Sequence, residues 1–243
     1  MRFEGASVLV TGGTRGIGRA IALRFARDGV ARVALGYLRN DAAAEAAAEE
    51  VRAAGAEPVL LRGNVSSQRI LDEVRALGPL DAVVHNAATG VIRPALEVEE
   101  KHWDWTLNAN ARALLSLARV SAPAMPPGSS IIAISSLGAQ RVLDNYSLIG
   151  TSKAALEALV RYLAVELAPA VRVNAVSAGV VETGALEHFP NRDEMLRVGA
   201  ANPVGRLVSP DDVAGAVAFL CSPDAEMVRG HVLVVDGGFS LPV

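Results

Sequence analysis

Short apolar runs alternate along the chain with longer stretches whose apolar residues recur at helical spacing. The runs lie at 7–10, 33–36, 59–61, 82–84, 131–134, 172–176 and 232–235, and the helical stretches at 19–28, 42–54, 67–77, 103–121, 151–168 and 211–220. Because most runs are continuous rather than alternating, both faces of each strand should be covered, as in a parallel sheet between helices. The pattern therefore predicts an α/β fold, a doubly wound parallel sheet of about seven strands with helices on both faces.

The size and composition of the chain favour one domain. Its 243 residues carry a formal net charge of −3, and no shift in composition marks a linker between two halves. We therefore expect residues 1–243 to form a single domain, with its ligand bound beyond the carboxyl ends of the strands.

The composition also disfavours several classes of function and location. The first ten residues lack a basic leader and a long apolar core, so we expect a cytoplasmic protein. The longest uncharged stretch, 120–140, contains three prolines, which argues against a membrane span. No basic arm or stripe suggests a nucleic-acid partner. Cys221 is the single cysteine, which excludes an intrachain disulfide or a cysteine-based metal cluster, so we assign it to the core and expect no metal site.

A glycine-rich turn joins the first predicted strand to the first helix, in the order Thr11-Gly12-Gly13-Thr14-Arg15-Gly16-Ile17-Gly18. Glycines let backbone amides approach a pyrophosphate, and the helix N-terminus offers unpaired donors and a favourable field to an anion. In this strand-turn-helix context the turn predicts a Rossmann-type dinucleotide site. Its expected cofactor-binding residues are Gly12, Thr14, Arg15, Gly16, Ile17 and Gly18.

The residues after the second strand bear on the choice between NAD and NADP. An acidic side chain there would bind the ribose hydroxyls of NAD and repel the extra phosphate of NADP, but the run 36–39 has none. Arg39 and Arg15 can instead form a cation pair around a 2′-phosphate. Asp41 is an alternative ribose ligand, although its place before the alanine-rich helix suits a helix cap better. We therefore expect NADPH rather than NADH.

Motifs spread over the whole chain resemble those of the short-chain dehydrogenase/reductase family. They are the glycine loop at 11–18, Asn64-Val65, Asn86-Ala87, Asn110, Ser135-Ser136, Lys153 and Asp236-Gly237-Gly238. The resemblance implies that Lys153 binds the nicotinamide ribose and that the segment from Gly179 to Thr183 passes near the nicotinamide. It also implies that residues after the third and fourth strands line the cofactor, namely Asn64, Val65, Asn86 and Ala87. Ala88 is a further candidate, because it too follows the fourth strand. A homotetramer is a further implication of the family.

A closer resemblance is to the NADPH-dependent enoyl-acyl-carrier-protein reductase III of bacterial fatty acid synthesis. It rests on the segments 86–94, 102–106, 135–138 and 236–241, on Ala178-Gly179 where most of the family has proline-glycine, and on six residues between Tyr146 and Lys153. This resemblance implies a trans-2-enoyl thioester of acyl-carrier protein or coenzyme A as substrate.

The spacing between the tyrosine and the lysine bears on the reaction. Most family members place a tyrosine four residues before the lysine, where this chain has Ile149, whereas Tyr146 lies seven residues before Lys153. Four residues turn a helix by roughly 400° and seven by roughly 700°, so either position can look into one cleft, and the longer offset moves the tyrosine roughly 4.5 Å along the axis. In enoyl reduction the charge collects on the thioester oxygen, two carbons from the carbon that receives hydride, so the acid must sit further out.

We therefore expect Tyr146 to donate a hydrogen bond to the thioester oxygen, and Lys153 to hold the ribose and lower the pKa of the tyrosine. Ser136 and Asn110 are further candidate catalytic residues through the family resemblance. The segment 185–207 lacks clear periodicity, and we predict a mobile lid over an acyl chain there. Two alternatives stay open: a 3-ketoacyl-thioester or other carbonyl reductase that uses Tyr146, and a cofactor-binding sensor without turnover.

Overall fold

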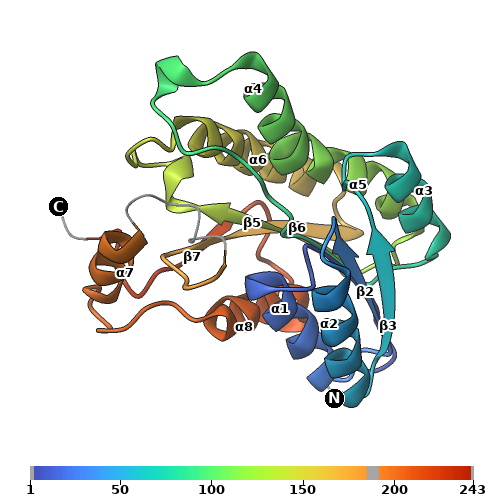
Figure 1. Cartoon of the computed structure of the whole chain (residues 1–243). Coiled ribbons are helices and arrows are strands. Elements are labelled where there is room, and N and C mark those ends of the chain that lie inside the picture. Colours follow the sequence, from blue (N-terminus) through green and yellow to red (C-terminus); the bar gives the residue numbers. More distant parts are fainter. Residues whose placement is uncertain (1–2, 185–191, 242–243) are drawn as a thin grey trace.

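A single parallel sheet forms the centre of the protein, whose computed structural model describes residues 3–184 and 192–241. The strand order is β3-β2-β1-β4-β5-β6-β7 (Figure 1). The strands are β1 Ser7–Thr11, β2 Arg32–Tyr37, β3 Glu57–Arg62, β4 Ala82–His85, β5 Ser129–Ser136, β6 Val171–Ala178 and β7 Val232–Val235. The order reverses between β1 and β4, and doubly wound sheets bind their ligands at the carboxyl ends of the strands beside such a switch point.

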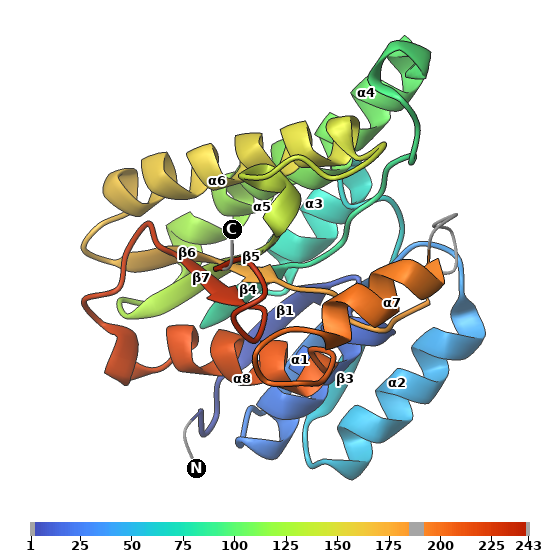
Figure 2. The ribbon, with the colours of Figure 1, turned by 90° about the vertical axis from the view of Figure 1, so that its left-hand side faces the viewer.

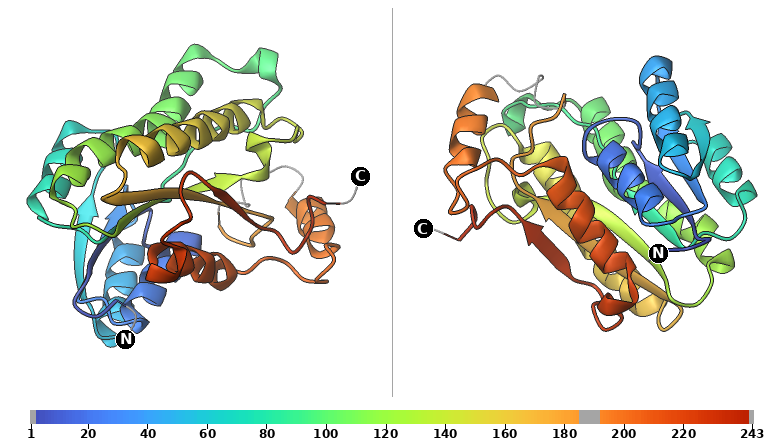
Figure 3. Two further views of the ribbon diagram at one scale, coloured as in Figure 1. Left: turned by 180° about the vertical axis from the view of Figure 1, so that it is seen from behind. Right: turned by 90° about the horizontal axis from the view of Figure 1, so that it is seen from below.

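Helices cover both faces of this sheet (Figures 1 and 2). One layer contains α1 (Gly16–Arg27), α2 (Asp41–Ala53) and α8 (Pro210–Cys221), and the other contains α3 (Gln68–Ala76), α4 (Glu100–Leu107), α5 (Ala113–Ser121) and α6 (Ser147–Glu166). The short helix α7 (Arg192–Ala200) extends the first layer at one end. Seen from below, α1 and α8 lie side by side under the sheet (Figure 3).

The core is divided into two parts by the sheet. Along β1, Val8 and Val10 pack into the cluster on the α1 and α8 side, whereas Leu9 packs into the cluster on the α3, α5 and α6 side. All three side chains are buried. Side chains alternate between the faces of a strand, so this burial confirms the expectation that continuous apolar runs are strands covered on both faces.

The structure confirms the predicted fold, and the differences lie in the helices. The helix predicted at 103–121 begins at Glu100 and contains a π-helical turn, Asn108–Arg112, between α4 and α5. The helix predicted at 151–168 begins at Ser147. The pattern did not predict α7, a helix of only nine residues in the segment assigned to the lid. Residues 185–191 of that predicted lid lie outside the described residues.

None of the helices formed by the described residues is both long enough and apolar enough to cross a membrane.

Candidate active site

The glycine loop lies between β1 and α1, at the switch point. Gly12 and Gly16 have positive φ angles of 63° and 51°, a conformation that glycine adopts without steric cost. A Cβ atom at Gly12 would come within 2.9 Å of the side-chain nitrogen of Asn86. Arg15, the N-cap of α1, supplies no side-chain cap to the helix, so the first amides keep their donors for an anion. The loop therefore fits a pyrophosphate that approaches the backbone closely.

A histidine and a threonine brace this loop. Nε2 of His85 lies 3.0 Å from a main-chain carbonyl of the π-helical turn. A neutral ring that donates there accepts through Nδ1 from the hydroxyl of Thr11, at 3.3 Å. The Thr11 oxygen in turn accepts the amides of Asn86 and Ala87 at 3.0 Å each, and the Asn86 side chain donates to two carbonyls of the loop. Burial, with a smaller effect from Lys153, lowers the pKa of His85 to about 4, which keeps the ring neutral.

The two arginines assigned to a 2′-phosphate are both exposed: Arg15 belongs to the glycine loop, and Arg39 follows β2. Among the described residues, neither Arg15 nor Arg39 forms an ion pair, whereas a carboxylate oxygen of Asp41 lies 3.4 Å from Nε of Arg62. The N-cap of α2 is Asn40, whose side chain accepts a backbone amide at 3.0 Å. The expectation that Asp41 caps this helix was therefore wrong, and its carboxylate is engaged by an arginine instead.

The other residues expected at the cofactor follow the carboxyl ends of strands in the same parallel sheet. Asn64 and Val65 follow β3, Ala88 follows β4, and Gly179 follows β6. The Thr183 side chain lies against the glycine loop. A Cβ atom at Gly16 would be 3.2 Å from a methyl carbon of Thr183. The topology thus brings these sequence-distant residues to the carboxyl edge of the sheet.

Tyr146 is the N-cap of α6, and it meets Ser136 at the end of β5. Its hydroxyl donates to the Ser136 oxygen at 3.3 Å. Asn145, immediately before it, has a φ of 59°, in the left-handed region that residues other than glycine adopt only uncommonly. This conformation turns the chain into the helix. The ten-residue spacing of the serine and the tyrosine therefore brings their hydroxyl groups together.

Tyr146 and Lys153 differ from the expected acid/base pair. Burial raises the pKa of Tyr146, and its hydrogen bond with Ser136 partly offsets this. The expected lowering of the Tyr146 pKa was therefore wrong. Nζ of Lys153 donates to the carbonyl of Ile134 at 2.7 Å. Lys153 is itself buried, and burial lowers its pKa to about 8, opposed by Glu157. At neutral pH the tyrosine is thus a protonated donor and the lysine a buried cation.

Asn110 lies in the π-helical turn, fully buried. Its side-chain oxygen accepts the Thr89 amide at 2.8 Å, and its nitrogen donates to the Thr89 carbonyl at 2.9 Å and to the Ser152 hydroxyl at 2.8 Å. Both amide hydrogens are thus used within the protein. The side chain fastens the segment after β4 to α6, which favours a positioning role over the catalytic role expected for it.

A cavity of about 550 Å³ opens beside Tyr146. Its wall is formed by Pro94 and Ala95, by residues 138–147 between β5 and α6, and by residues 150, 151 and 154 of α6. Ile149 does not belong to this wall. Its side chain instead lies against Gly90, where it occupies the space that a Cβ would need. The tyrosine, and not Ile149, therefore faces the cavity.

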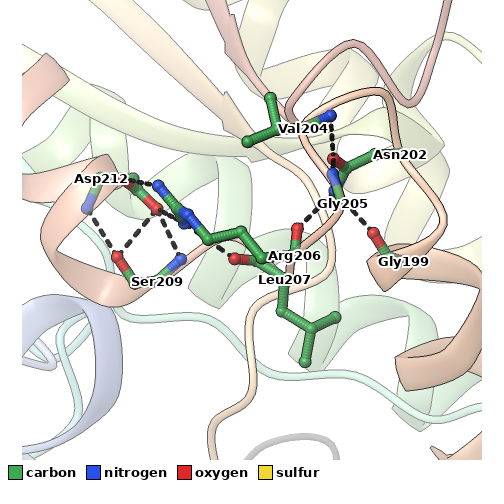
Figure 4. Close-up of polar contacts among 8 residues, drawn as sticks. All are labelled: Gly199, Asn202, Val204, Gly205, Arg206, Leu207, Ser209 and Asp212. Atoms are coloured by element: carbon green, nitrogen blue, oxygen red, sulfur yellow. Dashed lines mark hydrogen bonds and ion pairs between the residues drawn. The ribbon is translucent and has the colours of Figure 1, made fainter.

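The C-terminal part of the predicted lid ends in two side-chain networks (Figure 4). The Asn202 side chain donates to the carbonyls of Gly199 and Arg206 at 2.7 and 2.6 Å, and it accepts two backbone amides. Arg206 donates twice to the carboxylate of Asp212, at 2.6 and 2.9 Å. Asp212 also completes a capping box with Ser209 at the start of α8. The segment that follows α7 is thus held by side-chain hydrogen bonds of Asn202 and by the ion pair of Arg206 with Asp212.

Sequence reasoning missed the parts played by Thr11, His85 and Ser152. Thr11 and His85 stand at the ends of apolar runs, where the pattern marks only strand positions. Their contact depends on β1 and β4 being neighbours, and strands so far apart in the chain reveal their pairing only in the folded sheet. Thr11, the first residue of the glycine loop, was the one local signal that could have indicated this contact.

Comparisons with known proteins agree with this geometry. A family profile described as Enoyl-(Acyl carrier protein) reductase matches residues 12–240. The chain is 35% identical to the 1-cyclohexenylcarbonyl-CoA reductase of Streptomyces collinus, over 96% of this chain and 86% of that one. A short-chain dehydrogenase/reductase structure from Brucella melitensis has a TM-score of 0.90 and 30% identity, with 99% of both chains covered.

A second structure bears on the cofactor. A blue fluorescent protein from a metagenomic library, solved in complex with NADPH, has a TM-score of 0.89 and 31% identity, covering 99% of this chain and all of that one. The predicted fold and the expectation of a nicotinamide cofactor are confirmed at the level of the family. The chain therefore belongs to the short-chain dehydrogenase/reductase family of oxidoreductases, which bind a nicotinamide cofactor.

Proposed function

We propose that the protein uses NADPH to reduce the double bond of a trans-2-enoyl thioester, carried by acyl-carrier protein or coenzyme A, in fatty acid biosynthesis. The observation that carries this proposal is that Tyr146 lines the cavity while Ile149, four residues before Lys153, packs away from it. The description of the matching family profile supports it. So does the relative from Streptomyces collinus, whose name describes a thioester conjugated with a ring double bond.

The residues present fit NADPH. The glycine loop suits the pyrophosphate, and the exposed side chains of Arg15 and Arg39 suit a 2′-phosphate. Lys153 uses one of its three donors on the Ile134 carbonyl, which leaves two for the nicotinamide ribose. When bound, NADPH supplies a hydride to the β-carbon of the enoyl group.

Tyr146 then acts on the thioester oxygen. A hydroxyl aimed at this oxygen stabilises the negative charge that collects there during reduction. Burial holds the pKa of Tyr146 above its ordinary value, so the proton stays on the tyrosine as a donor. When that proton turns from Ser136 to the substrate, the serine can donate its own proton to the tyrosine oxygen. The pair of hydroxyls therefore stays hydrogen-bonded in both arrangements.

The described part of the predicted lid, residues 192–207, is proposed to cover the acyl chain. Arg192 at the start of α7 pairs with Glu182 at 2.9 Å, in the segment that follows β6 toward the glycine loop. The other end is anchored by Asn202. Hydrogen exchange in α7 should slow when NADPH and crotonyl thioester are added together. Unchanged exchange would identify this helix as ordinary surface structure.

The central experiment compares crotonyl and acetoacetyl thioesters as substrates for NADPH oxidation. We expect the crotonyl thioester to be reduced, and Tyr146→Phe to lower kcat roughly 100-fold or more because one oxyanion donor is removed. The NADPH dissociation constant should not change. Tyr162→Phe, which alters an exposed tyrosine of the same helix, is the matched control and should keep the parent rate.

Three results would contradict the proposal. Reduction of acetoacetyl but not crotonyl thioester would make the protein a carbonyl reductase. NADPH binding without turnover of either substrate would make it a sensor. A higher catalytic efficiency with NADH would contradict the assigned roles of Arg15 and Arg39.

A further inference from the structure

A buried carboxylate lies one helical turn beyond Lys153. Glu157 is only 4% exposed, and burying a charge is costly unless polar partners compensate it. Its Oε1 accepts the hydroxyl of Ser135 at 2.6 Å, and its Oε2 accepts the side-chain amide of Gln140 at 3.1 Å. Among the described residues, Glu157 forms no ion pair with a lysine or an arginine, and Arg161, one turn further on, is exposed. Its hydrogen-bond donors are therefore neutral, and its charge has to be balanced over a longer distance.

The cation that Glu157 faces is Lys153. Residues four apart lie on the same face of a helix, and both side chains are buried in α6. The Glu157 carboxylate raises the pKa of Lys153 against the lowering effect of burial. The other titratable groups near the lysine are His85 on β4, whose pKa Lys153 lowers, and Tyr146 at the start of α6. Of these groups, Glu157 is the only carboxylate.

The same carboxylate also fastens the wall of the cavity. Ser135 and Ser136 are consecutive in β5, so their side chains point to opposite faces. One hydroxyl binds Glu157 and the other binds Tyr146. Gln140, the second donor to Glu157, belongs to the wall of the cavity beside the tyrosine. One side chain therefore connects the strand end, the cavity wall and the helix that carries the lysine.

We propose that Glu157 is a positioning residue, which balances the charge of Lys153 and holds residues 135–140 in place so that cofactor and Tyr146 are correctly arranged. This inference rests on the proposed function, because it gives Lys153 the cofactor ribose as its ligand. Glu157→Gln separates the two tasks of the carboxylate. The amide keeps an oxygen that can accept the Ser135 hydroxyl, but it has no charge.

The test measures the NADPH dissociation constant by cofactor fluorescence from pH 6 to pH 9.5, without substrate. The Lys153 ammonium is present below its pKa and is lost above it, so affinity should weaken as pH rises. In Glu157→Gln the weakening should begin at least about half a pH unit lower, because the lysine has lost its compensating acid. At pH 6 the two proteins should agree within about threefold. Glu166→Gln, an exposed acid on the same helix, is matched in net charge and should follow the parent.

Superimposable pH profiles for Glu157→Gln and the parent would overturn the charge-balancing role. Gln140→Ala, a change at the surface, tests the second task if Glu157→Gln does not fold. It should speed hydrogen exchange of the amides at 138–146, and unchanged exchange would overturn the fastening role. Neither readout needs turnover, so their failure can be told apart from failure of the proposed function, which is tested by turnover of an enoyl thioester.

Discussion

At the scale of single residues, the position of Tyr146 depends on a glycine across the cavity wall. A Cβ at Gly138 would lie 2.5 Å from two ring carbons of the tyrosine. The φ of Gly138 is outside the left-handed region, so alanine is excluded by the ring and not by the backbone. Gly138→Ala should therefore displace the ring and lower kcat about tenfold, equivalent to about 1.4 kcal/mol in the barrier. Steady-state kinetics with crotonyl thioester and NADPH measures this change.

Gly215→Ala is the matched control for that substitution. A Cβ at Gly215 in α8 would meet only a side-chain nitrogen of Arg24, at 3.7 Å. Alanine is more favourable than glycine within a helix by about 0.5–1 kcal/mol, so this variant should be slightly more stable and fully active. If Gly138→Ala keeps the parent kcat, the ring has room to move and its fixed placement is not needed for the reaction.

At the scale of elements, the start of α8 depends on an acid that is bound from two sides. Arg206, with help from Ser209, holds the pKa of Asp212 well below its usual range. A carboxyl whose pKa is depressed by folding adds stability above its unfolded pKa of about 3.9, and that stability is lost as pH falls. Because the Arg206 side chain is 57% exposed, solvent screens much of the pair's energy.

Asp212→Asn should therefore lower the free energy of unfolding by about 1 kcal/mol at pH 7, the usual contribution of a helix cap. The difference from the parent should narrow at pH 3, because the unfolded chain then takes up a proton at this carboxyl while the folded protein keeps it ionised. Urea unfolding of the variant and the parent at pH 7 and pH 3 measures this difference in the free energy of unfolding. A difference that stays constant with pH would show that the contribution comes from packing and not from charge.

The elements differ in how far they could be predicted. The strands and the glycine loop followed from apolar runs and short motifs, because these encode local geometry. The π-helical turn at 108–112 could not be predicted, since the sequence pattern indicates one continuous helix over 103–121. The start of α6 at Ser147 depends on the left-handed backbone of Asn145, which the residue type permits but does not require.

At the scale of the whole molecule, candidate site residues could be named from the sequence, but their electrostatics could not be predicted. Ser136, Tyr146 and Lys153 could be assigned from spacing and family resemblance. The direction of the Tyr146 pKa could not, because it depends on burial of the hydroxyl and on its hydrogen bond with Ser136. Distances between side chains from different elements follow from tertiary packing, which no local motif records.

The expected homotetramer stays a prediction, and the outer surface of one helical layer supports it. Trp103 and Trp105 on α4 are 47% and 52% exposed, and Tyr162 and Val165 on α6 are 70% and 78% exposed. Exposed apolar side chains of this size are typical of subunit contacts. Light scattering should give about four times the chain mass of 25.2 kDa. Val165→Glu should shift the protein to smaller species, and a monomeric parent would contradict the expectation.

The stability of the whole molecule at acid pH should depend on His85, which joins β1, β4 and the π-helical turn. Its pKa of about 4 in the folded protein lies below the unfolded value of about 6.5. The folded state therefore favours the neutral ring, and this stability is complete above about pH 6.5 and is lost as pH falls toward 4. The limit of the loss is on the order of 3 kcal/mol.

His85→Gln should remove this pH dependence, because glutamine can donate and accept hydrogen bonds but does not titrate in this range. Urea unfolding between pH 7 and pH 4.5 should therefore show a shallower loss of stability in the variant, even if the variant is less stable at pH 7. His231→Gln, which changes an exposed histidine, is the control for the loss of one imidazole. Equal slopes for His85→Gln and the parent would mean that acid weakens the protein elsewhere. A shallower slope would place the acid-sensitive contact at the centre of the sheet, beside the loop that is proposed to bind the cofactor, so cofactor affinity should fall over the same pH range.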